Sequence, residues 1–197
     1  MRLILGIGNP GSSYRNNRHN VGFMFLDHLA EIYSASFLPS KGDYYSAELN
    51  LAGNQFCLIK PSNYVNNSGY SAHQAITYYN ALPEDLLVVY DDVYLPISEF
   101  RVRLAGGDGG HNGIKSIIYH LASENFNRLR IGVRGVNYSQ ENLVDYVLSD
   151  FSVEELSIIK SVFVKCRSLA EAFIIGGTKQ LLDVNSTLGK SEKNLNE

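Results

Sequence analysis

The first stretch of the chain constrains the fold most. Residues 2–7 are almost wholly apolar, which is typical of a buried strand. They lead into the elbow Gly-Ile-Gly-Asn-Pro-Gly at residues 6–11, where glycines permit a sharp turn. From about Asn20 the apolar residues recur at helical spacing. A strand, a tight loop and an amphipathic helix in this order predict an α/β fold.

The elbow also matches G-x-G-x-x-G, the glycine pattern of dinucleotide-binding folds. In those folds the N–H groups at a helix N-terminus bind a pyrophosphate, but Pro10 removes one such donor and residues 12–18 separate the glycines from the helical pattern. The acidic residue expected about 20 positions later is absent, because Asp27 and Glu31 fall inside the predicted helix. The sequence therefore favours a structural role for these glycines.

Strand-like and helix-like runs alternate along the rest of the chain. The continuous apolar run 86–90 predicts a central strand that ends at Asp91 and Asp92. Residues 97–104 alternate imperfectly, as expected for an edge strand, and Ser152 with Glu155 predicts a capping box for a long helix. Further strands are predicted at residues 44–51, 55–61 and 128–133. Helices are predicted at residues 68–79, 114–121 and 153–176, and a short final helix begins at about residue 178.

Length and composition indicate a single domain. A chain of 197 residues, 45% of them hydrophobic, is long enough for one sizeable core and short for two domains. We expect one α/β domain over residues 1–189, with a twisted mixed β-sheet and helices on both faces, and a polar, disordered tail at residues 190–197. No run approaches the roughly 20 apolar residues of a membrane span, so we expect no membrane partner and a cytoplasmic location. Cys57 and Cys166 have no C-x-x-C spacing, which favours buried thiols over a disulfide or zinc site.

Charge is distributed unevenly along the chain. The net charge of −3 argues against a surface coated with nucleic acid. Residues 101–134, however, contain six basic and two acidic residues, a local charge of +4. An ordinary solvated face is one interpretation. A phosphate-contacting patch is the other, and it gains support because the same segment holds the glycine loop 106–113.

Polar residues of similar kinds occur in four loops that follow predicted strands or precede predicted helices. Topology predicts that these loops converge at one edge of the sheet. Each residue also has a plainer explanation, because asparagine and aspartate often cap helices or form turns. Capping alone would account for Asn66 and Asn112, which lie at predicted helix starts. The six residues are Asn9, His19, Asn66, Asp91, His111 and Asn112.

His19 is the natural general base, because imidazole titrates near neutral pH and this residue lies at the start of a helix. Asp91 is the best candidate for the carboxylate that fixes its tautomer. No G-x-S-x-G motif supplies a nucleophile, so attack by an activated water is favoured. Asp91, Asp92 and His111 could meet around an ion, but the histidines lack metal-ligand spacing and a site without metal is favoured.

Six sequence blocks occur together in a fixed order. They are GIGNPG at residues 6–11 with Tyr14, RHNVG at 18–22, KP at 60–61 with YVNNSG at 64–69, DD at 91–92 with LP at 95–96, GGHNG at 109–113, and NF at 125–126 with RLRIG at 128–132. This set resembles the bacterial-type peptidyl-tRNA hydrolases, esterases that free tRNA from prematurely released peptides. The resemblance extends to about Leu188, and six ordered blocks are far more specific than one glycine motif.

The resemblance implies hydrolysis of the ester bond between a peptide and the 3′ ribose of tRNA, without metal or other cofactor. It implies that His19 is the catalytic base and that Asp91 orients it. Asn9, Asn66 and Asn112 match amides that position the peptide, the attacking water or the transition state. Asn9 is therefore grouped with the catalytic residues.

The same resemblance implies a set of substrate-binding residues. His111 matches a residue along the route of the tRNA 3′ end. Arg103, where the family tends to have lysine, is expected to clamp a tRNA phosphate together with Arg130. Tyr14 and Tyr64 lie in matching blocks and are expected to contact substrate. The implied partner is the acceptor stem and 3′ end of peptidyl-tRNA, bound by a monomer that acts in translation and ribosome rescue.

Three residues depart from the family pattern. Val65 stands where methionine is common, Asp108 puts an acid into the glycine loop, and Tyr94 replaces an acidic residue after the aspartate pair. None of them removes an expected catalytic group. A non-catalytic RNA-binding module on the same scaffold is the alternative function, and the joint presence of the catalytic set argues against it.

Overall fold

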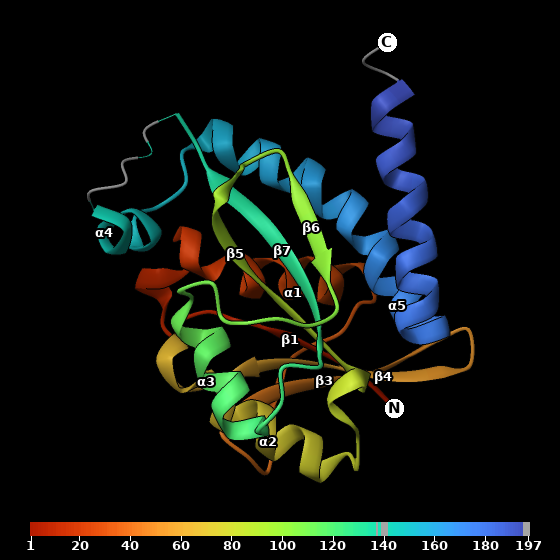
Figure 1. The fold of residues 1–197 in the computed structure, drawn as a ribbon. Helices are drawn as coiled ribbons and strands as arrows, with labels where there is room; N and C mark the ends of the chain where they lie inside the picture. Colours follow the sequence, from red (N-terminus) through yellow and green to blue (C-terminus); the bar gives the residue numbers. More distant parts are fainter. Residues whose placement is uncertain (137, 139–141, 195–197) are drawn as a thin grey trace.

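A seven-stranded mixed sheet forms the centre of the molecule in the computed structural model, which describes residues 1–136, 138 and 142–194. The strands are β1 (Arg2–Gly6), β2 (Leu38–Pro39), β3 (Tyr44–Leu51), β4 (Asn54–Pro61), β5 (Leu86–Pro96), β6 (Phe100–Arg103) and β7 (Asn127–Arg134). Their order in the sheet is β2-β3-β4-β1-β5-β7-β6 (Figure 1). The four central strands β4, β1, β5 and β7 pair in parallel, and the outer pairs are antiparallel.

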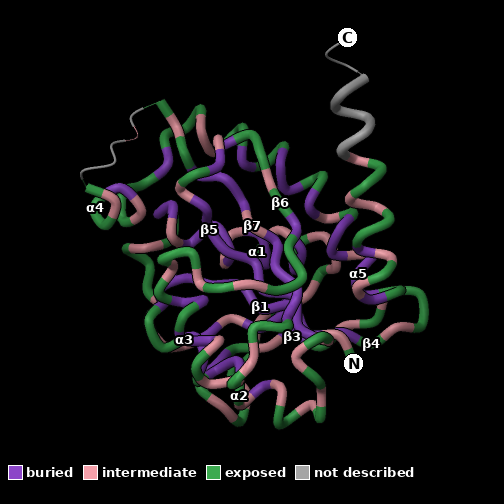
Figure 2. The backbone as a smooth tube through the Cα atoms, in the orientation of Figure 1, coloured by how far each residue is buried: buried purple, intermediate pink, exposed green. Residues whose placement is uncertain are grey.

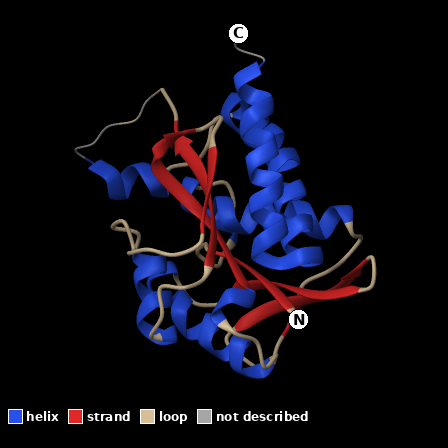
Figure 3. Ribbon diagram, turned by 45° about the vertical axis from the view of Figure 1, so that its right-hand side comes forward, coloured by secondary structure: helices blue, strands red, loops and turns tan. Residues whose placement is uncertain are grey.

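Helices pack against both faces of this sheet (Figure 3). They are α1 (Val21–Ile32), α2 (Ser68–Tyr78), α3 (Asn112–Leu121), α4 (Leu143–Leu148) and α5 (Val153–Asn194). On one face Leu87 and Val89 of β5 share a core with α1 and α5, and on the other Leu86 and Val88 share a core with α2 and α3. A strand buried on both faces needs a continuous apolar run, which explains residues 86–90 (Figure 2). The predicted single α/β domain with a twisted mixed sheet is confirmed.

The predicted end of the central strand is wrong. β5 continues through Asp91 and Asp92 to Pro96, because both aspartates remain paired in register with Ile131 and Gly132 of β7. The two carboxylates are buried yet have cationic or hydrogen-bonding partners, so the strand need not end where it becomes polar. The edge strand is confirmed but is shorter than predicted, since β6 covers only four residues.

The C-terminal helix is longer than the short element predicted from the sequence. The capping box forms, since the Ser152 hydroxyl accepts from the Glu155 N–H and the Glu155 carboxylate accepts from the Ser152 N–H. Gly177 then breaks the helical path with a φ of 64°, and the helix continues to Asn194, projecting away from the sheet (Figure 1). The expected disordered tail begins inside this helix, and residues 195–197 lie outside the described residues, so the boundary at 189 stays a prediction.

Two smaller expectations concern the core and the membrane. Cys57 and Cys166 are both free and fully buried, as predicted. Among the described residues no helix combines the length and the apolar character needed to cross a bilayer.

Candidate active site

A cleft of about 640 Å³ lies beside the carboxyl ends of β1 and β4 and the polar second half of β5. Its walls also include the N-terminus of α3 and one side of α4. The six polar residues singled out in the sequence all line this cleft, so the structure brings together Asn9, His19, Asn66, Asp91, His111 and Asn112. Their convergence is therefore a property of the fold, whereas their individual roles stay predictions.

The glycines of the first elbow bring the strand and the helix close together. A Cβ on Gly8 would lie 2.6 Å from the ring of Phe23, and a Cβ on Gly22 would lie 2.4 Å from the carbonyl oxygen of Val89. Short 3-10 turns, not an α-helix, follow the elbow directly. Close packing therefore accounts for these glycines, and the elbow leads into 3-10 turns, not directly into a helix as in a pyrophosphate site.

Asn9 is held in place at three points. Its N–H donates to Oδ1 of Asn20 and its carbonyl accepts from Nδ2 of the same residue, both at 2.9 Å. Its own side-chain Oδ1 accepts from the backbone N–H of Val65 at 3.0 Å. Because the acceptor end of the Asn9 amide is occupied, Nδ2 is the end that remains to donate into the cleft. Sequence reasoning missed Asn20, although it follows His19 directly.

His19, Asp91 and His111 form a compact polar cluster. Nδ1 of His19 lies 2.8 Å from Oδ1 of Asp91, and Nε2 of His111 lies 3.0 Å from the same oxygen. Burial alone would lower the pKa of His19, but the charge of Asp91 and its hydrogen bond outweigh burial and raise that pKa above its ordinary value. Burial would raise the pKa of Asp91, whereas the two imidazoles lower it, and the net pKa is below the ordinary range. The carboxylate therefore stays ionised beside His19.

His111 has a fixed tautomer. It is the N-cap of α3, and its Nδ1 accepts from the N–H groups of Gly113 and Ile114 at 3.1 and 3.3 Å. A nitrogen that accepts two hydrogen bonds carries no proton, so Nε2 carries the proton and donates to Asp91. The ligand atoms of His19, Asp91 and His111 lie within 4.8 Å of one another, close enough to hold a metal ion. For Nε2 of His111 to bind an ion, however, the proton would have to move to Nδ1 and break the helix cap.

Asn66 and Asn112 do not cap helices. The N-cap of α2 is Asn67 and the N-cap of α3 is His111, so the plainer explanation offered for both asparagines is wrong. Each is exposed and lines the cleft, and within the described part of the chain neither side chain has a hydrogen-bond partner. Their amides are therefore available to a bound molecule.

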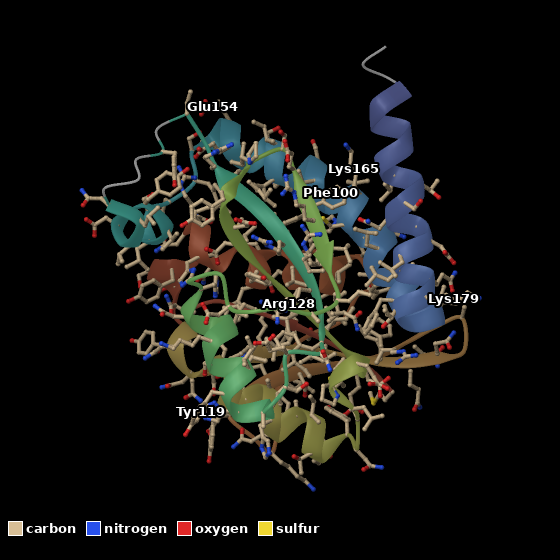
Figure 4. All side chains as sticks on the ribbon, viewed as in Figure 1. Phe100, Tyr119, Arg128, Glu154, Lys165 and Lys179 are labelled. Carbon is tan, nitrogen blue, oxygen red and sulfur yellow. The ribbon has the colours of Figure 1, made fainter. Side chains whose placement is uncertain are left out.

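Three arginines of β6 and β7 also line the cleft: Arg103, Arg128 and Arg130. Arg103 is exposed and lines the cleft, while Arg130 forms an ion pair with the buried Asp92 at 2.6 Å. Arg128, labelled in Figure 4, is buried. Its guanidinium donates to the carbonyls of Gly106 and Gly107. The local charge of +4 thus overstates the free charge, because Arg128 shapes the glycine loop and Arg130 is partly neutralised.

The remaining residues singled out in the sequence are the two expected substrate contacts and the three departures from the family pattern. The rings of Tyr14 and Tyr64 meet edge to face with centroids 6.3 Å apart, but neither residue lines the cleft itself. Tyr94 is exposed and Val65 is buried, and both line the cleft. Asp108 forms part of a turn, in which its carboxylate accepts a hydrogen bond from the N–H of Gly110 at 2.6 Å.

Comparison with known proteins gives a consistent result. Residues 3–194 match the family described as Peptidyl-tRNA hydrolase. The peptidyl-tRNA hydrolase of Thermotoga petrophila is 41% identical over 94% of this chain and 97% of its own length, and that of Aquifex aeolicus is 42% identical over 84% and 85%. A crystal structure of peptidyl-tRNA hydrolase from Acinetobacter baumannii superposes with a TM-score of 0.86 at 32% identity, covering 93% of each chain. The chain belongs to the peptidyl-tRNA hydrolase family, whose members are hydrolases that act on an ester bond.

Proposed function

We propose that the chain hydrolyses the ester bond between a peptide and the 3′ ribose of tRNA. The observation that carries this proposal is the His19–Asp91 pair inside a cleft that is also lined by three asparagine amides. A base and several amide donors around one cavity suit attack of water on a carbonyl group. Family membership supports the same substrate class.

In this mechanism His19 acts through Nε2, because Nδ1 is bound to Asp91. Nε2 accepts a proton from water as the water attacks the ester carbonyl, and the resulting imidazolium is stabilised by Asp91. Nδ2 of Asn9 donates to the developing oxyanion, with Asn66 and Asn112 as further donors. The imidazolium then returns its proton to the departing 3′ oxygen of the ribose. Cys57 and Cys166 are buried in the core, so neither thiol competes with water as the nucleophile.

We propose that the reaction needs no metal ion. The support is the tautomer of His111, whose Nδ1 caps α3 and whose Nε2 proton faces Asp91. Binding of an ion to the three-residue cluster would cost the cap and both hydrogen bonds to Asp91.

On the substrate side, we propose that Arg103 and Arg130 contact a phosphate of the acceptor stem. Arg103 supplies most of the free charge, because Arg130 already has a carboxylate partner. His111, Tyr14 and Tyr64 are proposed to contact the 3′ end or the peptide. The expectations of a monomer and of a cytoplasmic location stay predictions.

The decisive experiment measures peptide release from a defined peptidyl-tRNA in the presence of a chelator. We expect turnover by the wild-type chain, a loss of about 10²- to 10⁴-fold in kcat for His19→Ala, and retained binding of tRNA by that variant. His73→Ala is the matched control, because His73 is exposed on α2 and does not line the cleft.

Each alternative gives a different result in this assay. A binding-only module would bind tRNA without releasing peptide. A metal-dependent enzyme would lose turnover when the chelator is added. Wild-type turnover by His19→Ala would refute the assignment of the base.

A further inference from the structure

The 3-10 turn Arg18–Asn20 makes three buried connections in three directions. His19 contacts Asp91, and Asn20 holds the backbone of Asn9. Both connections belong to the site described above. Arg18 points elsewhere, toward the start of α5, and the proposed mechanism does not use it.

Arg18 is a buried cation paired with a carboxylate through both Nη atoms, while its Nε has no hydrogen-bond partner among the described residues. Only 5% of the residue is exposed. Its Nη1 and Nη2 both donate to Oε2 of Glu155, at 2.9 and 2.8 Å. The guanidinium carbon lies 4.6 Å from the ring centre of Tyr146 and 4.9 Å from that of Phe151. A planar, stacked guanidinium with two donors cannot be replaced by lysine, which has a single point charge.

The partners of Arg18 are tied to the end of β7. The hydroxyl of Tyr146 donates to the carbonyl of Val133 and accepts from the N–H of Gly135, both at 2.8 Å. A Cβ on Gly135 would lie 2.0 Å from Oε1 of Glu155, so glycine is needed for the carboxylate to approach. The cluster of Arg18, Tyr146, Phe151 and Glu155 therefore connects the end of β7, α4, the start of α5 and the turn that carries His19.

Backbone and amide contacts strengthen the same connection. Nδ2 of Asn17 donates to the carbonyl of Leu148 at 2.5 Å, and the N–H of Arg18 donates to the carbonyl of Ser149 at 3.1 Å. The N–H of Phe151 donates back to Asn16 at 3.0 Å. Since Leu143, Val144, Val147 and Leu148 of α4 line the cleft, the segment before His19 and one wall of the cleft are fixed by one set of contacts.

We propose that Arg18 is a positioning residue that sets the place of His19 and the place of α4 together, through its pair with Glu155. This inference rests on the proposed function for its effect on catalysis. Loss of the pair leaves the buried Arg18 or the half-buried Glu155 without its partner, and the turn and α4 shift apart. Misplacement of His19 lowers the rate of the chemical step, whereas Arg103 at the other side of the cleft still binds phosphate.

The test compares Arg18→Lys and Glu155→Gln with the wild-type chain on peptidyl-tRNA. We expect kcat to fall about 10- to 100-fold while KM changes by less than about twofold. Arg2→Lys is the matched control, because Arg2 also pairs with a carboxylate, Asp85, and lies 5.6 Å from an aromatic ring, Phe173. Arg2 lies at the amino end of β1, far from the cleft, so its variant should keep the wild-type kcat.

A second measurement does not depend on activity. Hydrogen–deuterium exchange of the α4 amides, residues 143–148, should be faster in Arg18→Lys and Glu155→Gln than in Arg2→Lys. Gly135→Ala should act in the same direction by displacing Glu155, which keeps the test available should Arg18→Lys fail to fold. Wild-type kcat and wild-type exchange in folded Glu155→Gln and Gly135→Ala would overturn the proposal. A wild-type chain that releases no peptide would instead refute the proposed function, and exchange would then decide the positioning role alone.

Discussion

The two sides of the cleft are built on different principles. The catalytic wall, formed by Asn9, His19, Asp91 and His111, consists of buried or half-buried side chains that each bind another part of the protein. The phosphate wall, formed by the loop 106–110 with Arg103 and Arg130, is open and carries exposed charge.

This difference matches what each wall has to do. Proton transfer and oxyanion stabilisation depend on distances within a few tenths of an ångström, so the groups that perform them need fixed partners. A phosphate is attracted over several ångströms by charge alone, so its ligands need less support. Changes in the catalytic wall should therefore lower kcat, whereas changes in the phosphate wall should alter KM and its salt dependence.

Apart from removal of His19, the largest effect is expected for Asp91→Asn. The carboxylate orients His19 and stabilises its imidazolium, so we expect kcat to fall by about 10² or more. The measurement is steady-state turnover of peptidyl-tRNA, with KM changed little. Asp92→Asn is the informative neighbour, because Asp92 pairs with Arg130 of the phosphate wall and not with His19, so it should change KM more than kcat.

Asp91→Asn should also change the pH dependence of the reaction. His19 acts as a base when it is neutral, so kcat/KM of the wild-type chain should rise with pH through a pKa above 6.5. Without the charge of Asp91, burial dominates and lowers the pKa of His19. The acidic limb of the profile should therefore move to lower pH while the plateau falls. An unmoved limb would mean that Asp91 does not control His19.

A smaller but still large effect is expected when the oxyanion donor is lost. Asn9→Ala removes the Nδ2 donor, and we expect kcat to fall by about 10²- to 10³-fold. Asn20→Ala leaves that donor in place but frees the backbone of Asn9, so its loss should be smaller than that of Asn9→Ala. Parallel kinetics on the two variants test this order. Equal losses of kcat in the two variants would show that Asn9 matters only through the backbone position that Asn20 holds, and not as an oxyanion donor.

On the phosphate wall, Arg103→Ala should raise KM and reduce the slope of log affinity against log salt by about 1, with kcat nearly unchanged. Arg101→Ala is the matched control, because Arg101 is exposed on the same strand but does not line the cleft. Arg130→Ala is expected to change the salt slope less than Arg103→Ala, since Asp92 already partly neutralises the charge of Arg130. Titration of tRNA at several salt concentrations separates the three variants.

The sequence predicted the layout of the fold because its signals are local. Apolar runs and the Ser152 capping box each act within a few residues. The end of β5 was mispredicted because Asp91 and Asp92 find partners that are distant in sequence. The polarity of a residue does not show whether its charge is buried beside a partner from a distant part of the chain.

The sequence pointed to six polar residues that line the cleft, but not to the contacts between them. His19 and Asp91 were paired from topology, but nothing in the sequence indicated that His111 shares the same carboxylate oxygen. Asn20 has no pattern of its own, because its role depends on the curvature of the elbow before it. The sequence does not distinguish Arg128 from Arg130. Only the structure shows that Arg128 is buried and holds the glycine loop.

The smallest effect is expected for Asp108→Asn, which tests whether an acid in the glycine loop opposes tRNA binding. The carboxylate accepts from the N–H of Gly110, and an asparagine side chain can make the same hydrogen bond through its oxygen. The turn before His111 should therefore persist, and kcat should stay at the wild-type value. Removal of one negative charge near a polyanion should lower KM by about twofold or less at low salt and by less at high salt. A fall in kcat would mean that the charge of Asp108 also supports His111, which would extend the fixed geometry of the catalytic wall into the phosphate wall.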